Sequence, residues 1–133
     1  MSQLDVISVV DDDGSVREAI ESLLKSVGYR VELFASAEEF LKPGARQETV
    51  CLILDVRMSG MSGLELQSRL TASNRSIPII FISAHSDENA RARAIAAGAI
   101  AFLQKPFSEE ALLDAINACL DSTVDGAEPE QSV

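Results

Sequence analysis

Residues 50–55 read Val-Cys-Leu-Ile-Leu-Asp, five consecutive apolar side chains that stop at a carboxylate. An apolar run without alternation is typical of a strand buried on both faces, as in a parallel sheet that helices cover on each side. Segments of similar character predict four more strands, at 6–10, 29–34, 78–82 and 100–103. Five such segments in one chain indicate a core built around a sheet.

Apolar side chains at helical spacing follow each of these strands. They predict helices at 15–27, 36–41, 62–70, 87–97 and 108–120. Three of the helices begin with a Ser-x-x-Glu capping box: Ser15 with Glu18, Ser36 with Glu39, and Ser62 with Glu65. Strands and helices that alternate through right-handed crossovers predict an α/β fold, a doubly wound five-stranded parallel sheet in a three-layer sandwich.

The composition argues against several classes of function. A net charge of −10 disfavours non-specific nucleic-acid binding, which depends on a basic surface. No apolar run approaches the roughly 20 residues of a membrane span, and the N-terminus lacks the features of a signal peptide. Cys51 and Cys119 lie in apolar segments and are expected to be reduced core residues of a cytoplasmic protein. From Asp121 onward the chain has four acids and no base, so residues 122–133 are predicted to form an acidic, disordered tail.

Charged and hydroxyl side chains stand where the predicted strands end. Asp11, Asp12 and Asp13 follow the first strand, Asp55 the third, Ser83 the fourth, and Lys105 with Pro106 the fifth. Ligand sites of doubly wound sheets lie beyond these carboxyl ends, so the side chains are expected to converge. Packed carboxylates repel unless one is protonated or a cation lies among them. Oxygen ligands without His or Cys favour Mg²⁺.

A phosphoryl group is the expected ligand, because Mg²⁺ in proteins is commonly coordinated by a substrate phosphate as well as by the protein. Lys105 would neutralise one phosphoryl oxygen, and Ser83 would hydrogen-bond to another. Asp55 stands alone at its strand end and is the candidate nucleophile. A carboxylate that attacks phosphorus forms an aspartyl phosphate.

Each of these residues has a simpler interpretation when it is taken alone. An Asp run before a helix is commonly a solvated N-terminus, and a lone Asp after a strand commonly forms a turn. Ser83 alone is a candidate helix cap, Lys105 with Pro106 a surface turn, and His85 an exposed loop residue. The combination at four strand ends is what favours a phosphoryl site.

Four segments resemble the receiver domain of two-component response regulators, which has a CheY-like, flavodoxin-type fold. They are Val9–Asp13 (VVDDD), Leu54–Gly63 (LDVRMSGMSG), Phe81–Ala84 (FISA) and Phe102–Phe107 (FLQKPF). The resemblance is to receivers of the FixJ/NarL type, which are usually fused to a helix-turn-helix output domain. It predicts a receiver domain over residues 1–121, followed by the tail at 122–133.

The resemblance implies that Asp55 accepts a phosphoryl group from a sensor histidine kinase or a phosphotransfer protein. It also implies Mg²⁺, with Mn²⁺ as an alternative, bound directly by Asp12, Asp55 and the backbone carbonyl of Arg57. Asp11 would act on the ion through water. A protein of this family promotes its own phosphorylation and dephosphorylation and is not a turnover enzyme on other substrates.

The resemblance also implies which residues contact the phosphoryl group and which change conformation in response. Ser83 and Lys105 would contact it, and the family's Lys-Pro bond is cis, an isomer open to X-Pro bonds. Ser83 and Phe102 occupy switch positions, so phosphorylation would draw Ser83 inward and let Phe102 rotate. The output face would be the fourth helix, the fifth strand and the fifth helix, including residues 90–97 and 102–108. Its partner would be a downstream protein or a second receiver, with no direct binding of nucleic acid and no membrane contact.

Three positions after the strand ends bear on the site's dynamics. Ser59 stands where family members usually have Pro, so the loop after Asp55 loses a fixed φ and is expected to lose some order. Arg57 and His85 lie two residues beyond Asp55 and Ser83, where the family's side chains influence hydrolysis of the phosphoryl group. Both are expected to set its lifetime.

The residues alone leave other functions open. A phosphatase of the haloacid dehalogenase type would use Asp11 and Asp13, but it needs a late acidic cluster for which only Asp87 and Glu88 are available. A flavodoxin-like nucleotide carrier would need backbone amides, not three carboxylates, after the first strand. A receiver that signals without phosphate would not need the complete acid, Ser and Lys set. A stand-alone receiver is expected, with the N-terminal receiver of a helix-turn-helix transcription factor as the alternative.

Overall fold

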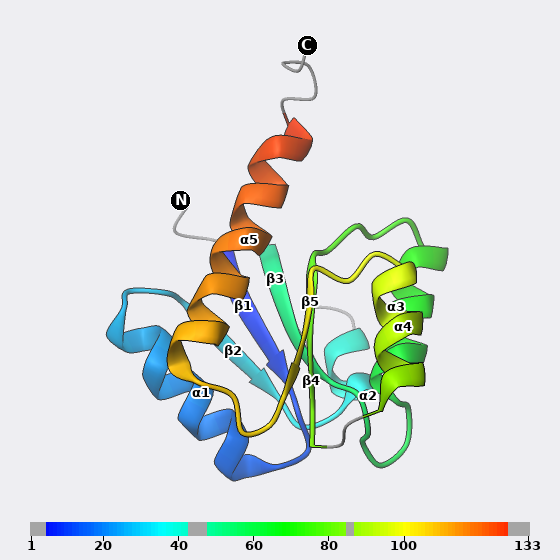
Figure 1. Ribbon diagram of the computed structural model, residues 1–133, viewed down its shortest axis with the longest axis horizontal. Helices are drawn as coiled ribbons and strands as arrows, with labels where there is room; N and C mark the ends of the chain where they lie inside the picture. The colour runs from blue at the N-terminus through cyan, green and yellow to red at the C-terminus, as the bar shows by residue number, and fades with distance from the viewer. Residues whose placement is uncertain (1–4, 43–47, 85–86, 128–133) are drawn as a thin grey trace.

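The computed structural model describes residues 5–42, 48–84 and 87–127 of the 133-residue chain. Within these residues five parallel strands form one sheet, as predicted (Figure 1). Their bounds are β1 (Asp5–Val10), β2 (Val31–Phe34), β3 (Glu48–Asp55), β4 (Ile79–Ser83) and β5 (Ala101–Gln104). The order β2-β1-β3-β4-β5 means that the chain reverses its travel across the sheet between β1 and β3. Ligands of doubly wound sheets bind at such a switch point.

The helices of the described residues cover both faces of the sheet. Their bounds are α1 (Gly14–Ser26), α2 (Ala37–Leu41), α3 (Gly63–Ala72), α4 (Glu88–Ala96) and α5 (Glu109–Ala127). Helices α1 and α5 pack on one face, and α2, α3 and α4 pack on the other (Figure 1). The predicted three-layer α/β sandwich is therefore confirmed.

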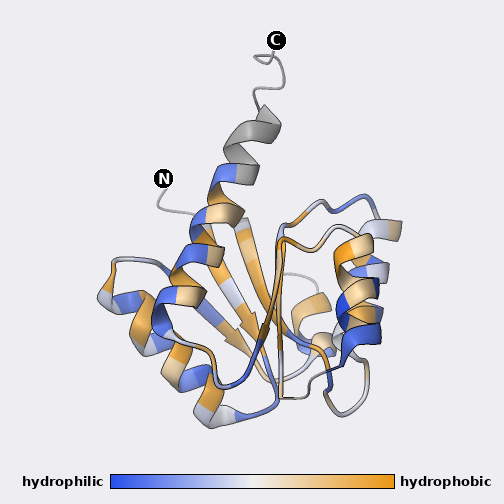
Figure 2. Ribbon diagram, in the orientation of Figure 1, coloured by the Kyte–Doolittle hydropathy of each residue, from blue (hydrophilic) through white to orange (hydrophobic). Residues whose placement is uncertain are grey.

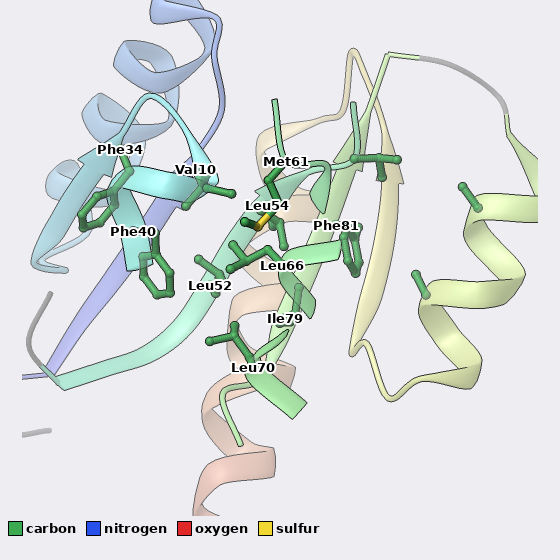
Figure 3. Close-up of a cluster of buried hydrophobic side chains, with 14 residues drawn as sticks. Val10, Phe34, Phe40, Leu52, Leu54, Met61, Leu66, Leu70, Ile79 and Phe81 are labelled. Carbon is green, nitrogen blue, oxygen red and sulfur yellow. The ribbon is translucent and has the colours of Figure 1, made fainter. Parts of the chain in front are cut away.

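Strand β3 is buried on both faces, which explains its uninterrupted apolar run. Leu52 and Leu54 lie in the core shared with α2, α3 and α4, together with Leu66 (Figure 3). Cys51 and Ile53 lie in the core beneath α1 and α5. In Figure 2 the strands are mostly hydrophobic, whereas hydrophilic and hydrophobic residues alternate along the helices.

Hydrogen bonds at the helix starts confirm two of the three predicted caps. The confirmed pairs are Ser36, which accepts from the N–H of Glu39, and Ser62, which accepts from the N–H of Glu65. The predicted cap of Ser15 with Glu18 is wrong, because α1 begins at Gly14 with Asp13 as its N-cap. Asp13 takes this role because its Oδ1 accepts both the N–H and the hydroxyl of Ser15, at 2.9 and 2.7 Å.

Strand β2 begins at Val31, two residues later than the predicted start at Tyr29. Gly28 has a φ of +95°, the left-handed conformation that often ends a helix. The N–H of Tyr29 donates to the carbonyl of Leu24 at 3.0 Å. Tyr29 therefore still belongs to the C-terminal turn of α1.

Helix α5 continues to Ala127, seven residues past its predicted end at Leu120 (Figure 1). The sequence contains no proline or glycine between Leu120 and Gly126, so no residue there stops the helix. Residues 122–127 continue the helix and 128–133 lie outside the described residues, so the acidic, disordered tail stays a prediction. The domain boundary at residue 121 stays a prediction. Within the described part of the chain, no helix is long and apolar enough to span a bilayer.

Candidate functional site

Four of the predicted strand-end side chains, those of Asp11, Asp12, Asp55 and Lys105, meet at the switch point between β1 and β3. Carboxylate oxygens of Asp11, Asp12 and Asp55 all lie within 4.8 Å of one another. The ammonium of Lys105, which follows β5, lies 3.0 Å from Oδ2 of Asp11 and 3.6 Å from Oδ1 of Asp55. Three carboxylates and one ammonium thus share one corner of the molecule.

Asp11 is fully buried, and each of its acceptors has a donor. Lys105 contacts Oδ2, and the N–H of Asp13 donates to Oδ1 at 2.9 Å. The guanidinium of Arg17 donates to the backbone carbonyl of Asp11 at 2.7 Å. Arg17 was not among the predicted site residues, because a contact between a helix side chain and a strand-end carbonyl leaves no sequence pattern.

Asp12 is exposed and joins two loops of the site. Its Oδ2 accepts the backbone N–H of Ser59 at 3.2 Å. A proline at position 59 has no N–H to donate. The serine that departs from the family pattern therefore ties the loop after Asp55 to the loop after β1, which offsets the fixed φ that proline would supply.

Asp55 is almost completely buried at the end of β3. Burial, and then the neighbouring charge of Asp11, raise its pKa to about 6, although Lys105 acts in the opposite direction. Burial lowers the pKa of Lys105, but its contacts with Asp11 and Asp55 outweigh that effect and raise the pKa above its usual value. The carboxylates therefore hold Lys105 charged, while their own repulsion is only partly relieved.

A divalent cation matches the charge and chemistry of this group. The donors are all carboxylate oxygens, the ligands that Mg²⁺ prefers. Three carboxylates beside one ammonium carry an excess of two negative charges when all are ionised. Asp11, Asp12 and Asp55 could hold such an ion.

Ser83 is buried at the end of β4, beside the strand that leads to Lys105. Its backbone carbonyl accepts the N–H of Lys105 at 2.7 Å. The peptide bond between Lys105 and Pro106 is cis, as the resemblance implied. Ser83 and Lys105 therefore lie side by side at the ends of neighbouring strands.

The other predicted functional residues lie around this centre or outside the described residues. Phe102 is half-buried on β5, with its ring centroid 6.1 Å from that of Phe81. Arg57 is exposed and forms an ion pair with Asp87, the N-cap of α4. His85 lies outside the described residues, so its predicted effect on the phosphoryl lifetime stays a prediction.

Asp13 caps α1 and is not part of the carboxylate group. Its Oδ1 accepts the N–H and hydroxyl of Ser15, and these hydrogen bonds lower its pKa. The described carboxylate group contains Asp11, Asp12 and Asp55, without Asp13. The arrangement therefore does not support the alternative of a phosphatase that uses Asp11 and Asp13 as a pair.

The loop after Asp55 is positioned by two residues that the sequence analysis did not assign. The N–H of Gly63 donates to the carbonyl of Val56 at 2.9 Å, and a Cβ at Gly63 would lie 2.2 Å from the carbonyl oxygen of Asp55. Glu38 in α2 accepts the N–H of Met61 at 3.0 Å. The one hint in the sequence of the close approach between Gly63 and Asp55 is that a glycine directly follows the predicted cap Ser62.

Comparisons with known proteins agree on one family. The profile of the response regulator receiver domain matches residues 7–117. The response regulator TmoT of Ectopseudomonas mendocina is 52% identical over 118 residues, which cover 89% of this chain and 54% of TmoT. This chain therefore spans about half the length of the curated relatives it matches.

Solved structures show the same likeness. The response regulator StyR has a TM-score of 0.83 and 49% identity, over 96% of this chain and 65% of that one. FixJ-N has a TM-score of 0.80 and 34% identity, over 91% of this chain and 96% of that one. Sequence and fold thus point to the same relatives.

The variant Gly63→Ala should lower the free energy of unfolding by about 1–3 kcal/mol, because its Cβ would collide with the backbone of Asp55. Urea denaturation measures the change. Gly14→Ala is the matched control, since its Cβ would meet only the flexible Arg17 side chain at 3.4 Å. It should be neutral or stabilising by up to about 1 kcal/mol. Equal effects of the two variants would contradict the close approach at Gly63.

The contribution of Asp55 to the stability of the metal-free protein should fall as the pH rises from 4 to 7. Asp55 has a folded-state pKa near 6, above the ordinary value of 3.8, so the folded state binds its proton more tightly than the unfolded state does. The unfolding free energy of Asp55→Asn relative to wild type should therefore grow with pH, by up to about 3 kcal/mol. Thermal or urea unfolding in EDTA measures the difference. A difference that stays constant over this range would show that Asp55 titrates normally.

Proposed function

The chain belongs to the response regulator receiver domain family of two-component signalling proteins, and we propose that Asp55 is its phosphoacceptor. The proposal rests above all on the contact between Lys105 and Asp55, 3.6 Å apart within a group of three carboxylates. A nucleophilic carboxylate beside a fixed ammonium is suited to accept a phosphoryl group, whose oxygens need cationic partners.

In the proposed reaction, an oxygen of Asp55 forms a bond to phosphorus while the bond from phosphorus to a histidine nitrogen of the donor breaks. The donor is a sensor histidine kinase or a phosphotransfer protein, and its leaving imidazole keeps the electron pair. Lys105 offsets the charge of one phosphoryl oxygen, and the Ser83 hydroxyl donates to another. Water later hydrolyses the aspartyl phosphate and restores Asp55. The protein thus promotes both steps on its own residue and does not turn over other substrates.

We propose that Mg²⁺, or Mn²⁺ in its place, is held by Asp12, Asp55 and the backbone carbonyl of Arg57, with Asp11 acting through water. The grouping of three carboxylates within 4.8 Å supports this assignment. Bound there, the ion would neutralise charge on the carboxylates and on the incoming phosphoryl group. Ser59 would keep Asp12 oriented through its N–H.

The proposed output face comprises α4, β5 and α5. Ile95 on α4 is 42% exposed, one of two large apolar side chains that the described residues leave exposed. Phe102 on β5 is half-buried, next to Phe81, and is the proposed aromatic switch together with Ser83. Exposed and half-buried apolar side chains such as Ile95 and Phe102 suit contact with a downstream protein or a second receiver. The strongly acidic chain is unsuited to direct contact with nucleic acid.

A second candidate for the output is a further domain of the same polypeptide. TmoT is about twice as long as the segment it shares with this chain, which favours a receiver that belongs to a longer regulator over the expected stand-alone protein. We propose the cytoplasm as the site of action in either case. Cys51 and Cys119 are buried and form no disulfide in the described residues, which supports a reducing compartment.

Mg²⁺ should raise the melting temperature, because it binds the folded carboxylate group in preference to the unfolded chain. At tenfold excess over its dissociation constant the stabilisation is about 1.4 kcal/mol. Asp12→Ala should remove most of the shift. Asp13→Asn is the matched control, since Asn is an equally good N-cap and position 13 lies outside the carboxylate group. A full Mg²⁺ shift in Asp12→Ala would remove Asp12 from the ion's ligands.

Acetyl phosphate or a phosphorylated histidine kinase should add one phosphoryl group to the wild type in the presence of Mg²⁺. Asp55→Asn should abolish this addition, because the amide keeps the shape but loses the nucleophile. Asp13→Asn should be phosphorylated like the wild type. Intact-protein mass spectrometry measures the addition, and peptide mapping locates it. A phosphoryl group on Asp11, or on the Asp55→Asn protein, would refute the assignment.

A further inference from the structure

An ion pair spans the rim of the site between Arg57 and Asp87. Arg57 lies two residues after Asp55, and its guanidinium Nη2 donates to Oδ2 of Asp87. The other oxygen of Asp87 accepts the N–H of Ala90 at 3.0 Å and so caps α4. One carboxylate therefore starts α4 and also connects that helix to the loop after Asp55.

Helix α4 has few other strong attachments to the molecule. Its buried side chains are the two small ones of Ala90 and Ala94, whereas α1 buries Ile20 and Leu24. One polar contact joins it to α3, where the Gln67 side-chain amide donates to the carbonyl of Ala94 at 3.2 Å. Because burial of a methyl group stabilises far less than burial of a whole Leu side chain, a weak tether has more influence on α4 than on the other helices.

A hollow of about 340 Å³ lies between α4 and the loop after β3. Val56, Met58 and Leu64 line one side, Ala90 and Arg93 line the other, and both partners of the ion pair lie at its wall. The helix is therefore not close-packed against this loop. Space for a displacement exists where the ion pair makes the connection.

We propose that the Arg57–Asp87 ion pair is a latch that holds α4 to the phosphoacceptor loop while Asp55 is unphosphorylated. This inference rests on the proposed phosphorylation of Asp55. The Arg57 side chain is 57% exposed, so little packing restrains it from changing partner. A phosphoryl group on Asp55 adds about two negative charges and several acceptor oxygens two residues away from Arg57. It competes with Asp87 for the guanidinium, and α4 keeps its N-cap but loses its tether.

Hydrogen exchange of the α4 amides tests the latch in the unphosphorylated 133-residue chain. Arg57→Gln removes the donor charge and leaves the backbone carbonyl in place. Asp87→Asn removes the acceptor charge and keeps a side-chain oxygen that caps the helix. Each variant should speed exchange of amides 91–96 by about two- to fivefold, the range of an exposed ion pair. The double variant should exchange no faster than either single one, because both remove the same interaction.

Beryllofluoride with Mg²⁺, as a mimic of the phosphoryl group, should speed exchange of the same amides in the wild type. It should cause little further change in either variant. Arg69→Gln is the matched control, because it breaks an exposed ion pair with Glu65 on α3 and removes the same charge. It should leave exchange in α4 unchanged.

Single variants without effect on α4, or a double variant equal to the sum of the two, would overturn the latch. So would a beryllofluoride response in the variants as large as that of the wild type. A wild type that takes no phosphoryl group on Asp55 would overturn the proposed function instead. Even then, the unphosphorylated variants alone decide whether the ion pair restrains α4.

Discussion

Lys105 offsets part of the charge of Asp11 and Asp55, two carboxylates buried side by side, and the architecture of the site depends on that contact. Ionised carboxylates are costly to bury, and a single ammonium at 3.0 and 3.6 Å offsets the cost only in part. The contact requires that the end of β5 reach across to the ends of β1 and β3, which the strand order allows. The remaining negative charge favours a bound cation, and Lys105 together with such a cation would offset the charge of an incoming phosphoryl group.

The sequence predicts the fold and most of the site because both follow from local patterns. Five apolar runs define the strands, and once the sheet is doubly wound, Asp11, Asp55, Ser83 and Lys105 must stand at one edge. Predictions failed where two neighbouring residues could each cap the same helix. They also missed contacts between segments that are far apart in the sequence. At the start of α1, the Asp13 carboxylate outcompetes the Ser15 hydroxyl, although both residues are good caps.

Contacts between distant segments leave weaker signals in a single sequence. The space that Gly63 leaves for the carbonyl of Asp55, and the amide of Ser59 that donates to Asp12, both depend on how two loops approach each other. Ser59 illustrates the point. Judged by backbone stiffness alone, replacement of proline weakens the loop, whereas in three dimensions the freed N–H gives that loop a partner in the site.

The helices differ in how firmly they pack against the sheet. Those beside the carboxylates pack firmly, and α4, on the proposed output face, packs weakly. Helices α1 and α3 bury large aliphatic side chains against the sheet. This packing keeps Asp11, Asp12 and Asp55 in place when a phosphoryl group is added. Helix α4 buries alanines and borders a hollow, so we expect it to move first when its polar attachments change. Because one of those attachments begins two residues from Asp55, a local change in charge can move a helix without disturbing the carboxylates that receive the charge. Arg57 thus connects the phosphoacceptor loop to the weakly attached helix α4.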